Sequence, residues 1–259
     1  MKDNTGRKLS TVSTAVHVLE ALRDLEGAGV TELANHLELS KAAVHGHLST
    51  LRDEQLVAKR GDDYHLSYHF VTLGEYVKNQ SDLYTAGKER VNGLAEDTGE
   101  FAHLMTEQFG YGVHLFKSQG DQAVGEPYHI RNLQRRDYLH YSAAGKAILS
   151  RLPTERIRSI IAERGLPQRT ENTITSESEL LDQLETIRER GYAFNDEEEI
   201  DGLRAVAAPI DTDSLDTVGA ISLSAPISRF SGQYYRDEIP EMIMHAANLI
   251  ELDIETTNK

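Results

Sequence analysis

The sequence of 259 residues contains no cysteine. Disulfide bonds and thiolate metal sites are therefore excluded, and this absence is typical of proteins that work in a reducing compartment. No apolar run approaches the roughly 20 residues that a membrane-spanning helix needs. The first residues, MKDNTGRKLS, lack the apolar core of a signal peptide. We therefore expect a protein of the cytoplasm that has no membrane partner.

The sequence also lacks the short motifs of several enzyme classes. It has no GxSxG nucleophile elbow, no phosphate-binding GxxxxGK[ST] loop and no HExxH zinc motif. A cysteine nucleophile is excluded because the sequence contains no cysteine. We therefore do not expect an enzyme, and we assign no catalytic residue, no cofactor and no metal ion.

Lysine is scarce, with nine residues in a chain whose net charge is −15. Residues 1–60 carry eight basic and eight acidic residues, whereas residues 61–259 carry 19 and 34, so the whole acidic excess lies in the second segment. Strong surface charge keeps proteins soluble in concentrated salt. We therefore expect a halophilic, haloarchaeal source, and the alternative is an ordinary acidic cytosolic protein. In about 1 M salt the Debye length is about 3 Å, so DNA binding would depend more on shape and base contacts than on phosphate attraction.

Residues 29–48, GVTELANHLELSKAAVHGHL, have the pattern of two short helices joined by a tight turn. The second helix begins at Ser40, whose hydroxyl can accept a hydrogen bond from the first turn. The pattern predicts a helix-turn-helix, and a plain helical hairpin in a core is the alternative. The predicted buried residues are Leu33, Ala34 and Leu37 in the first helix, and Ala43, Val44, Leu48 and Leu51 in the second.

The opposite face of the second helix carries small or hydrogen-bonding side chains. Such a face can enter the DNA major groove, which is roughly 12 Å wide, while a few groups reach base edges and phosphates. The candidate DNA contacts on this helix are Ser40, Lys41, Ala42, His45, Gly46 and Ser49.

Residues 56–66 follow with a strand, a turn and a returning strand, which predicts a β-hairpin wing. Lys59 and Arg60 stand where a wing meets the phosphate backbone, and we add them to the DNA-binding candidates. An amphipathic helix is predicted before the motif, over Ser10–Leu25. Three helices and a hairpin make a winged helix-turn-helix, which favours DNA binding over the plain hairpin. The first helix has a candidate buried stripe of Val12, Val16, Leu19 and Leu22.

The remaining chain predicts a linker and an α+β domain. Ser67–Thr98 has two helical pieces, and apolar surface on a linker often pairs with a second subunit. Because helix-turn-helix proteins usually read two half-sites related by two-fold symmetry, we expect a homodimer. Strands are predicted over Phe101–Glu107, Tyr111–Ser118, Val124–Ile130, Leu203–Ile210 and Val218–Ser224, and helices over Tyr141–Arg151, Thr154–Glu163, Ser176–Arg190 and Gln233–Ile254.

Three polar segments of this domain are candidates for chemistry. Small residues over 140–147, HYSAAGKA, can expose backbone N–H groups to an anion at a helix start, or can simply allow close packing. The acidic residues 196–199 favour a solvated or ion-paired loop over a metal site, with Arg204 as a candidate partner. Ser222 and Ser224 are two residues apart on a strand, so both hydroxyls project from one face and can line a pocket.

The chain resembles the IclR (isocitrate lyase regulator) family of transcription factors. The resemblance rests on LSKAAVHGHLSTL, HYSAAGKAIL, RGYAFNDEE, GLRAVAAPI and GAISLSAPISR in that order. It implies a repressor or activator that is dimeric or a dimer of dimers, with a winged helix-turn-helix joined by a linker helix to a GAF/PAS-like effector-binding domain. The implied effector is a small metabolite, often a carboxylate, an aromatic acid or a sugar-derived compound.

The resemblance also implies a set of effector-binding residues. This chain departs from the family pattern at Asn195, where an acid is common, at Ala205, where some members have cysteine, and at Gly46, where a larger basic residue is common. The ligand and operator of a relative are therefore not carried over. The implied effector contacts are Ala143 and Ala144 through their N–H groups, with Asn195, Ala205, Ser222 and Ser224.

The expected organisation is a DNA-binding domain at 1–68, a linker helix at 69–80 and an effector-binding domain at 81–259. The expected function is a ligand-responsive regulator of a metabolic operon that binds double-stranded operator DNA and a small-molecule metabolite, with carbon catabolism as the family-level expectation. A structural DNA-binding protein without an effector, and a small-molecule enzyme with a DNA-binding head, remain as alternatives. A structural DNA-binding protein without an effector would be expected to have basic residues in excess outside its DNA-binding domain, whereas residues 61–259 of this chain have an acidic excess.

Overall fold

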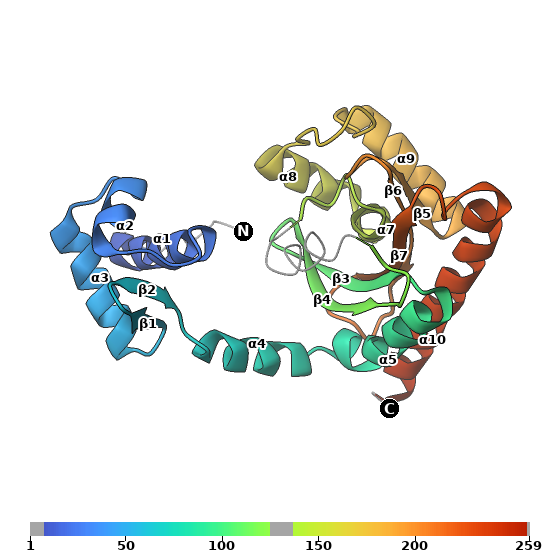
Figure 1. Ribbon diagram of the computed structural model, residues 1–259. Helices are drawn as coiled ribbons and strands as arrows, with labels where there is room; N and C mark the ends of the chain where they lie inside the picture. The colour runs from blue at the N-terminus through green and yellow to red at the C-terminus, as the bar shows by residue number, and fades with distance from the viewer. Residues whose placement is uncertain (1–7, 125–136, 258–259) are drawn as a thin grey trace. The chain divides into compact units, whose positions relative to one another are not determined.

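The computed structural model describes residues 8–124 and 137–257, and it divides into two compact units, Met1–Lys78 and Asn79–Lys259. The first unit is a helical core that carries an antiparallel hairpin (Figure 1). Its elements are α1 (Ser10–Asp24), α2 (Val30–His36), α3 (Lys41–Asp53), β1 (Val57–Arg60), β2 (Asp63–Leu66) and α4 (His69–Asn79). The winged helix-turn-helix prediction is confirmed.

The buried face of α1 agrees with the predicted one only in part. Leu22 is buried and Leu19 is partly buried, as expected. Val12 and Val16 are 58% and 47% exposed, and the rest of the buried face is formed by Val18 and Ala21. The reason is that α1 has apolar residues on two faces, and spacing alone does not tell which face meets α2 and α3. In α3, Ala43 is also exposed, although Val44, Leu48 and Leu51 are buried as expected. An apolar surface on α1 is therefore left open.

Helix α4 spans His69–Asn79, and none of its residues is buried. Val71, Tyr76 and Val77 are each more than 60% exposed. A helix normally owes its stability to an apolar face that packs against something. Within the described residues, α4 has no such partner.

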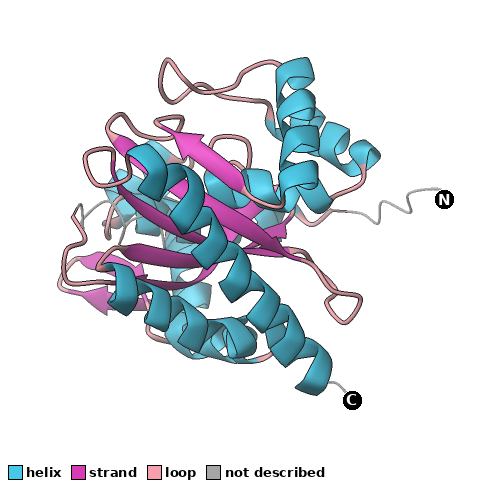
Figure 2. Cartoon of the chain, turned by 90° about the vertical axis from the view of Figure 1, so that its right-hand side faces the viewer, coloured by secondary structure: helices cyan, strands magenta, loops and turns pink. Residues whose placement is uncertain are grey.

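The second unit is a five-stranded antiparallel sheet between two layers of helices. The strand order is β4-β3-β7-β6-β5. In Figure 2 the helix that ends at the C-terminus lies across the strands. The elements are α5 (Asp82–Thr98), β3 (Phe101–Gln108), β4 (Tyr111–Gln119), α7 (Ala143–Arg151), α8 (Thr154–Arg164), α9 (Glu177–Arg190), β5 (Ala193–Asp196), β6 (Leu203–Ile210), β7 (Gly219–Pro226), a π-helical turn η1 (Tyr234–Glu238) and α10 (Ile239–Thr257).

Strand alternation gives the sheet two different faces. On β7, Ile221 and Leu223 point to the core formed with α5 and α10, while Ala220 packs in the core formed with α7, α8 and α9. Because successive side chains point to opposite faces, Ser222 and Ser224 lie on the α7 side. The fold therefore places polar strand residues beneath the start of α7.

The strand predictions differ from the structure in two places. The segment after Gly191 forms β5, an edge strand paired with β6, where the sequence indicated only an acidic loop. The strand expected over Val124–Ile130 lies, apart from Val124, outside the described residues.

The helix starts differ too. Ser176 precedes α9 as expected, but its hydroxyl bonds the Ser178 hydroxyl (2.9 Å) and makes no cap bond. The C-terminal helix begins with the π-helical turn η1 before it becomes α-helical at Ile239.

Candidate functional site

The outer face of α3 is the candidate DNA-reading surface. Ser40 caps the helix, since its Oγ accepts a hydrogen bond from the Ala43 N–H at 3.1 Å. A Cβ added at Gly46 would meet no atom within 4 Å, so this face is open in the first unit. Of the other candidates, Lys41, Ala42 and His45 are exposed and Ser49 is half-buried. The structure thus brings the candidate residues of α3 together on one accessible surface.

The wing presents two cations. Lys59 and Arg60 are exposed at the end of β1, and neither forms an ion pair with any described residue. Lys59 Nζ lies 5.7 Å from the centre of the Tyr64 ring, and Arg60 Cζ lies 5.9 Å from that of Tyr68. These contacts orient the side chains without neutralising them. Both charges remain available to a phosphate.

The second unit contains a small cavity of about 40 Å³ between the start of α7 and the polar face of the sheet. Five predicted effector residues line it, namely Ala143, Ala144, Ala205, Ser222 and Ser224. The remaining lining residues are His103, Met105, His114, Lys117, Asp137, Ser142, Glu199 and Leu203.

Asn195 does not line this cavity. Its Nδ2 donates to the Tyr141 carbonyl at 2.8 Å, and its Oδ1 accepts from the Glu198 N–H at 3.0 Å. The side chain is buried on β5, at the edge of the sheet, and both ends of its amide are used by backbone groups. Asn195 therefore braces the segment before α7 against the loop after β5, and the structure does not bring it together with the other five predicted effector residues.

Two histidines are the main polar features that the sequence did not reveal. His103 Nε2 lies 2.9 Å from Ser224 Oγ, and His114 Nε2 lies 3.1 Å from Asp137 Oδ2. The two rings are 5.6 Å apart, centre to centre. Burial lowers the pKa of His114, more than the hydrogen bond to Asp137 raises it. The histidines come from different strands, so only the pairing of β3 with β4 brings them together.

Lys117 supplies a positive charge to the cavity lining. Burial lowers the pKa of its ammonium group to about 8, against the opposing attraction of Glu199 and Asp137. A lysine of this kind changes its charge close to neutral pH. The cavity therefore combines a titratable cation, two imidazoles and the N-terminus of a helix.

The small residues in the first turn of α7 are compatible with both predicted roles, an anion-binding helix start and close packing. Ser142 Oγ caps the helix by accepting from the Gly145 N–H at 3.0 Å. The first N–H groups of a helix have no carbonyl partner within the helix and attract anions, and here Ala143 and Ala144 line the cavity. Close packing is equally real, because a Cβ on Gly145 would lie 2.2 Å from the Leu139 carbonyl oxygen.

Two of the four acidic residues over 196–199, Asp196 and Glu198, form ion pairs. Arg204 Nε lies 2.6 Å from Asp196 Oδ1, so the predicted partner is confirmed. Glu198 is buried against Lys146 of α7, which has no exposed surface. No three His, Asp or Glu residues among those described are grouped to hold a metal ion.

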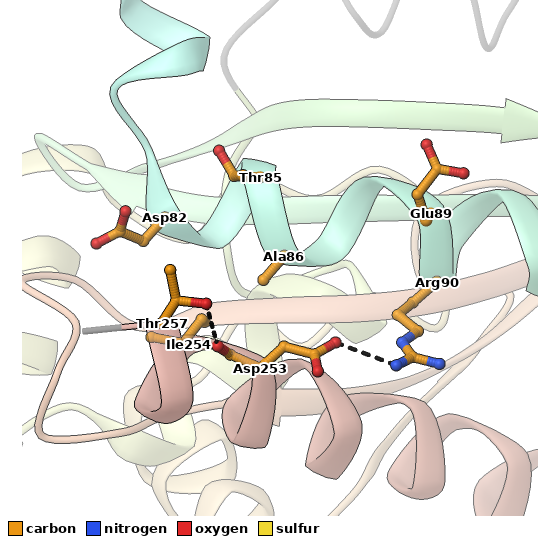
Figure 3. A pocket seen from close by; sticks show the side chains of 8 residues that line it. All are labelled: Asp82, Thr85, Ala86, Glu89, Arg90, Asp253, Ile254 and Thr257. Carbon is orange, nitrogen blue, oxygen red and sulfur yellow. Dashed lines mark hydrogen bonds and ion pairs between the residues drawn. The ribbon is translucent and has the colours of Figure 1, made fainter. Parts of the chain in front are cut away.

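A second hollow lies between α5 and α10 (Figure 3), away from every predicted site residue. Arg90 Nη2 and Asp253 Oδ2 form an ion pair across it at 3.1 Å. Their side chains are 40% and 46% exposed, respectively. Exposed pairs of this type contribute little energy. The hollow is a groove between two helices, and its lining also contains the carboxyl groups of Asp82 and Glu89. None of the helices in the described residues is long and apolar enough to cross a membrane.

Comparisons with known proteins agree with this architecture. A family model described as "Bacterial transcriptional regulator IclR C-terminal" matches residues 75–252, and one for the IclR helix-turn-helix domain matches residues 11–61. The chain is 39% identical over 251 residues to the probable HTH-type transcriptional regulator ArcR of Halobacterium salinarum, covering 96% of this chain and 95% of that protein. It is 28% identical to the HTH-type transcriptional regulator KdgR of Escherichia coli, covering 95% of this chain and 92% of that one.

One solved structure, an IclR homolog from Microbacterium hydrocarbonoxydans complexed with 4-hydroxybenzoate, has a TM-score of 0.79 at 17% identity. The match covers 95% of this chain and 99% of that one. At this level of identity, the likeness demonstrates a shared fold.

Proposed function

Because the chain belongs to the IclR family of transcriptional regulators, we propose that it is a ligand-responsive DNA-binding regulator of a metabolic operon. Residues 1–68 would bind the operator, residues 69–80 would form the linker, and residues 81–259 would bind the effector. The protein would act in the cytoplasm, as a homodimer or a dimer of dimers. Curated relatives include KdgR of Escherichia coli and an acetate operon repressor, which supports a role in carbon metabolism.

The observation that carries the DNA-binding part is the open face of α3 beside a wing with two unpaired cations. A side chain at Gly46 would meet nothing, and Lys59 and Arg60 form no ion pair with described residues. We assign base or phosphate contacts to Ser40, Lys41, Ala42, His45, Gly46 and Ser49 on α3, with Lys59 and Arg60 on the wing.

The effector site of the proposal is the cavity at the start of α7. Its polar groups converge from one helix and three strands, a combination that is typical of sites for small polar ligands. The α7 N–H groups of Ala143 and Ala144 would hold a carboxylate. Ala205, Ser222 and Ser224 would form the floor. A solved structure that shares the fold holds 4-hydroxybenzoate, which is itself a carboxylate.

Dimerisation is supported by two open apolar stripes in the first unit. One lies on α1 and contains Leu9, Val12 and Val16, and the other lies on α4. Contiguous exposed apolar surface on a soluble protein marks an interaction site. A second copy of the chain would bury the stripes and set two recognition helices about one DNA turn apart.

The proposal is tested by mapping the protein on its own genome and then measuring gel shifts on the operators found. Adding metabolites of the neighbouring genes should change the operator affinity about 5 to 150-fold, the usual range of allosteric coupling. A shift that no metabolite alters would support an effector-free DNA-binding protein instead. Formation of product from the metabolite would support an enzyme.

A further inference from the structure

A third hollow lies at the edge of the sheet, between α9, β5 and the π-helical turn η1. It has a volume of about 560 Å³ and shares no lining residue with the cavity at the start of α7. Arg190, the last residue of α9, and Arg236 of η1 both line it, and we call it the arginine hollow. Neither arginine forms an ion pair with any residue that the structure describes. Because the chain has a net charge of −15, two unpaired cations at one hollow point to an anion that binds there.

Arg190 is held in a fixed orientation while most of its hydrogen-bond donors stay unused. The side chain is half-buried, and its Cζ lies 4.9 Å from the ring centres of both Tyr192 and Phe194. Its Nε donates to the Tyr192 carbonyl at 2.6 Å. A guanidinium group has five N–H donors, so its two terminal NH₂ groups are left without a partner among the described residues. An oriented guanidinium with free NH₂ groups is suited to bind two oxygens of one anion.

The carboxylates that line the arginine hollow are already paired with other cations. Asp196 Oδ1 and Oδ2 accept hydrogen bonds from Arg204 at 2.6 Å and 3.2 Å. Both carboxylate oxygens of Glu198 accept hydrogen bonds from Lys146. Neither Arg204 nor Lys146 lines the hollow. Because each acid is matched by a cation outside the lining, the two unpaired arginines give the hollow a local positive excess.

The turn η1 holds Arg236 beside the hollow. Tyr235 is buried, and its hydroxyl donates to the Asn195 carbonyl at 3.0 Å, which fixes the turn against β5. The Arg236 side chain is exposed and forms no ion pair with Asp237 or Glu238, the next residues of the described turn. π-Helical turns are rare and are found frequently at functional sites. The position of this second cation is therefore set by the fold before a ligand arrives.

The charge and the size of the hollow indicate which anion it takes. A phosphate monoester carries about two negative charges at pH 7 and has three strong acceptor oxygens, so it can bind both arginines at once. A carboxylate has one charge and two oxygens. Small-molecule sites have volumes of roughly 300–1,000 Å³, and the hollow lies within this range. The DNA backbone fits less well, because it would extend beyond the hollow over a unit in which acidic residues are in excess.

We infer that the arginine hollow is a second ligand site, separate from the effector cavity, and that it binds the phosphoryl group of a small phosphorylated metabolite between Arg190 and Arg236. The two sites meet at the loop after β5, in which Glu198 lines the hollow and Glu199 lines the cavity. The inference does not depend on operator recognition, so it can fail while the proposed function holds.

The first experiment measures binding of inorganic phosphate and of glycerol 3-phosphate to the full-length protein by calorimetry, at one fixed KCl concentration. We expect one phosphate site per chain. Arg190→Met should weaken binding of both probes about tenfold or more, because hydrogen bonds to a charged group are lost. Arg190→Lys keeps the charge without the paired N–H groups and should recover only part of the affinity. A wild-type protein that binds neither probe overturns the inference.

Arg236→Gln is the second variant, because an exposed side chain can be changed without disturbing the core. It should weaken both probes, and it decides the test if Arg190→Met does not fold. Two variants serve as controls and should bind phosphate like the wild type: Arg158→Gln removes an exposed arginine of α8, and Lys117→Met changes the effector cavity. Wild-type affinity in both the Arg190 and Arg236 variants overturns the inference, and a loss in Lys117→Met alone places the anion in the effector cavity.

Hydrogen exchange locates the site directly. Adding phosphate should slow exchange in peptides that cover residues 190–198 and 233–239, and should leave residues 140–147 unchanged. Slower exchange over 140–147 alone overturns the inference. Gel shifts on a duplex without an operator test the DNA backbone as the other source of phosphate. If neither probe binds and Arg190→Met lowers the affinity for this duplex, the arginines contact DNA and the inference is wrong.

Discussion

Lys146 Nζ lies 2.5 Å from both carboxylate oxygens of Glu198, and the lysine side chain has no exposed surface. Burial lowers the pKa of Lys146 and raises that of Glu198, and each charge opposes the shift of the other. The pair joins α7 to the loop after β5. That loop also carries Glu199, which lines the cavity. The wall of the cavity is therefore attached to the core of the domain by an ion pair.

Removing one partner of this pair should destabilise the protein strongly. Lys146→Met or Glu198→Gln alone leaves a buried charge without its partner, which costs about 3–5 kcal/mol. The double variant Lys146→Met/Glu198→Gln should recover a large part of that loss. Urea denaturation of the three variants measures this coupling. Single variants that are as stable as the wild type would contradict the prediction, and Arg158→Ala, an exposed ion-pair residue, is the control.

Lys41→Ala should weaken operator binding across all sequences. If Lys41 contacts a phosphate, its loss lowers the slope of log affinity against log salt by about one unit. Gel shifts or fluorescence anisotropy at several KCl concentrations give this slope. Arg158→Ala removes an equal charge from α8 in the second unit and should leave the slope unchanged. A Lys41→Ala protein with wild-type affinity at every salt concentration would remove this residue from the interface.

The melting temperature should rise between low salt and molar KCl. The net charge of −15 destabilises the compact state by self-repulsion, and concentrated salt screens that repulsion. Circular dichroism melts at increasing KCl concentration measure the effect. A melting temperature that is flat or falls with KCl would favour an ordinary acidic cytosolic protein, even though a relative from Halobacterium salinarum is 39% identical.

Affinity for a carboxylate effector should fall as the pH rises from 7 to 9. The pKa of Lys117 is about 8, so above that pH its positive charge is lost, and affinity drops by up to about tenfold per pH unit. His114 does not contribute a charge change in this range, because burial holds the pKa of its imidazole below the usual value. Lys117→Met should bind more weakly and show a flat profile. A steep decline in Lys117→Met would assign the titration to another group.

The lowered pKa of Lys117 also predicts that folding stability rises with pH, whereas the affinity for a carboxylate effector falls. The unfolded chain binds the Lys117 proton up to about pH 10.5, and the folded protein releases it near pH 8. Between these values the unfolded state holds more protons, so this lysine makes the folded protein gain stability as the pH rises. Denaturation of wild type and Lys117→Met at pH 8 and pH 10 separates this contribution from those of other groups.

If the proposed dimer forms through α4, Val77→Asp should make the protein monomeric. Val77 is 65% exposed on a helix that buries none of its own residues. A charge there makes burial against a second copy costly. Light scattering with size-exclusion chromatography, run in molar KCl, gives the mass. Glu75→Gln, a polar change on the same helix, should remain dimeric, and a dimeric Val77→Asp would place the interface elsewhere.

The helix-turn-helix could be predicted because local signals determine it. Ser40 caps α3 as its position indicated, and the hairpin follows from Gly61, whose φ of +63° suits a tight turn. The face of α1 could not be assigned, because both of its faces are apolar. Likewise, the exposure of the apolar residues of α4 is seen in the packing of the structure, and their spacing in the sequence does not predict it.

The cavity could be predicted only in part. Ser222, Ser224 and the α7 start follow from alternation and from small residues at a helix start. His103 and His114 are 11 residues apart and meet through the pairing of β3 with β4, which no short pattern encodes. Asn195 was placed by resemblance alone, and its hydrogen bonds to two backbone groups show how a polar side chain at a family position can be structural.

The close approach at Gly145 limits how the effector domain can respond. With no room for even a methyl group beside the Leu139 carbonyl, the start of α7 cannot slide past the segment that precedes it. That segment includes Asp137, which is bridged to β4 through Gly112. An occupant that pulls on the helix therefore pulls on strand β4 as well.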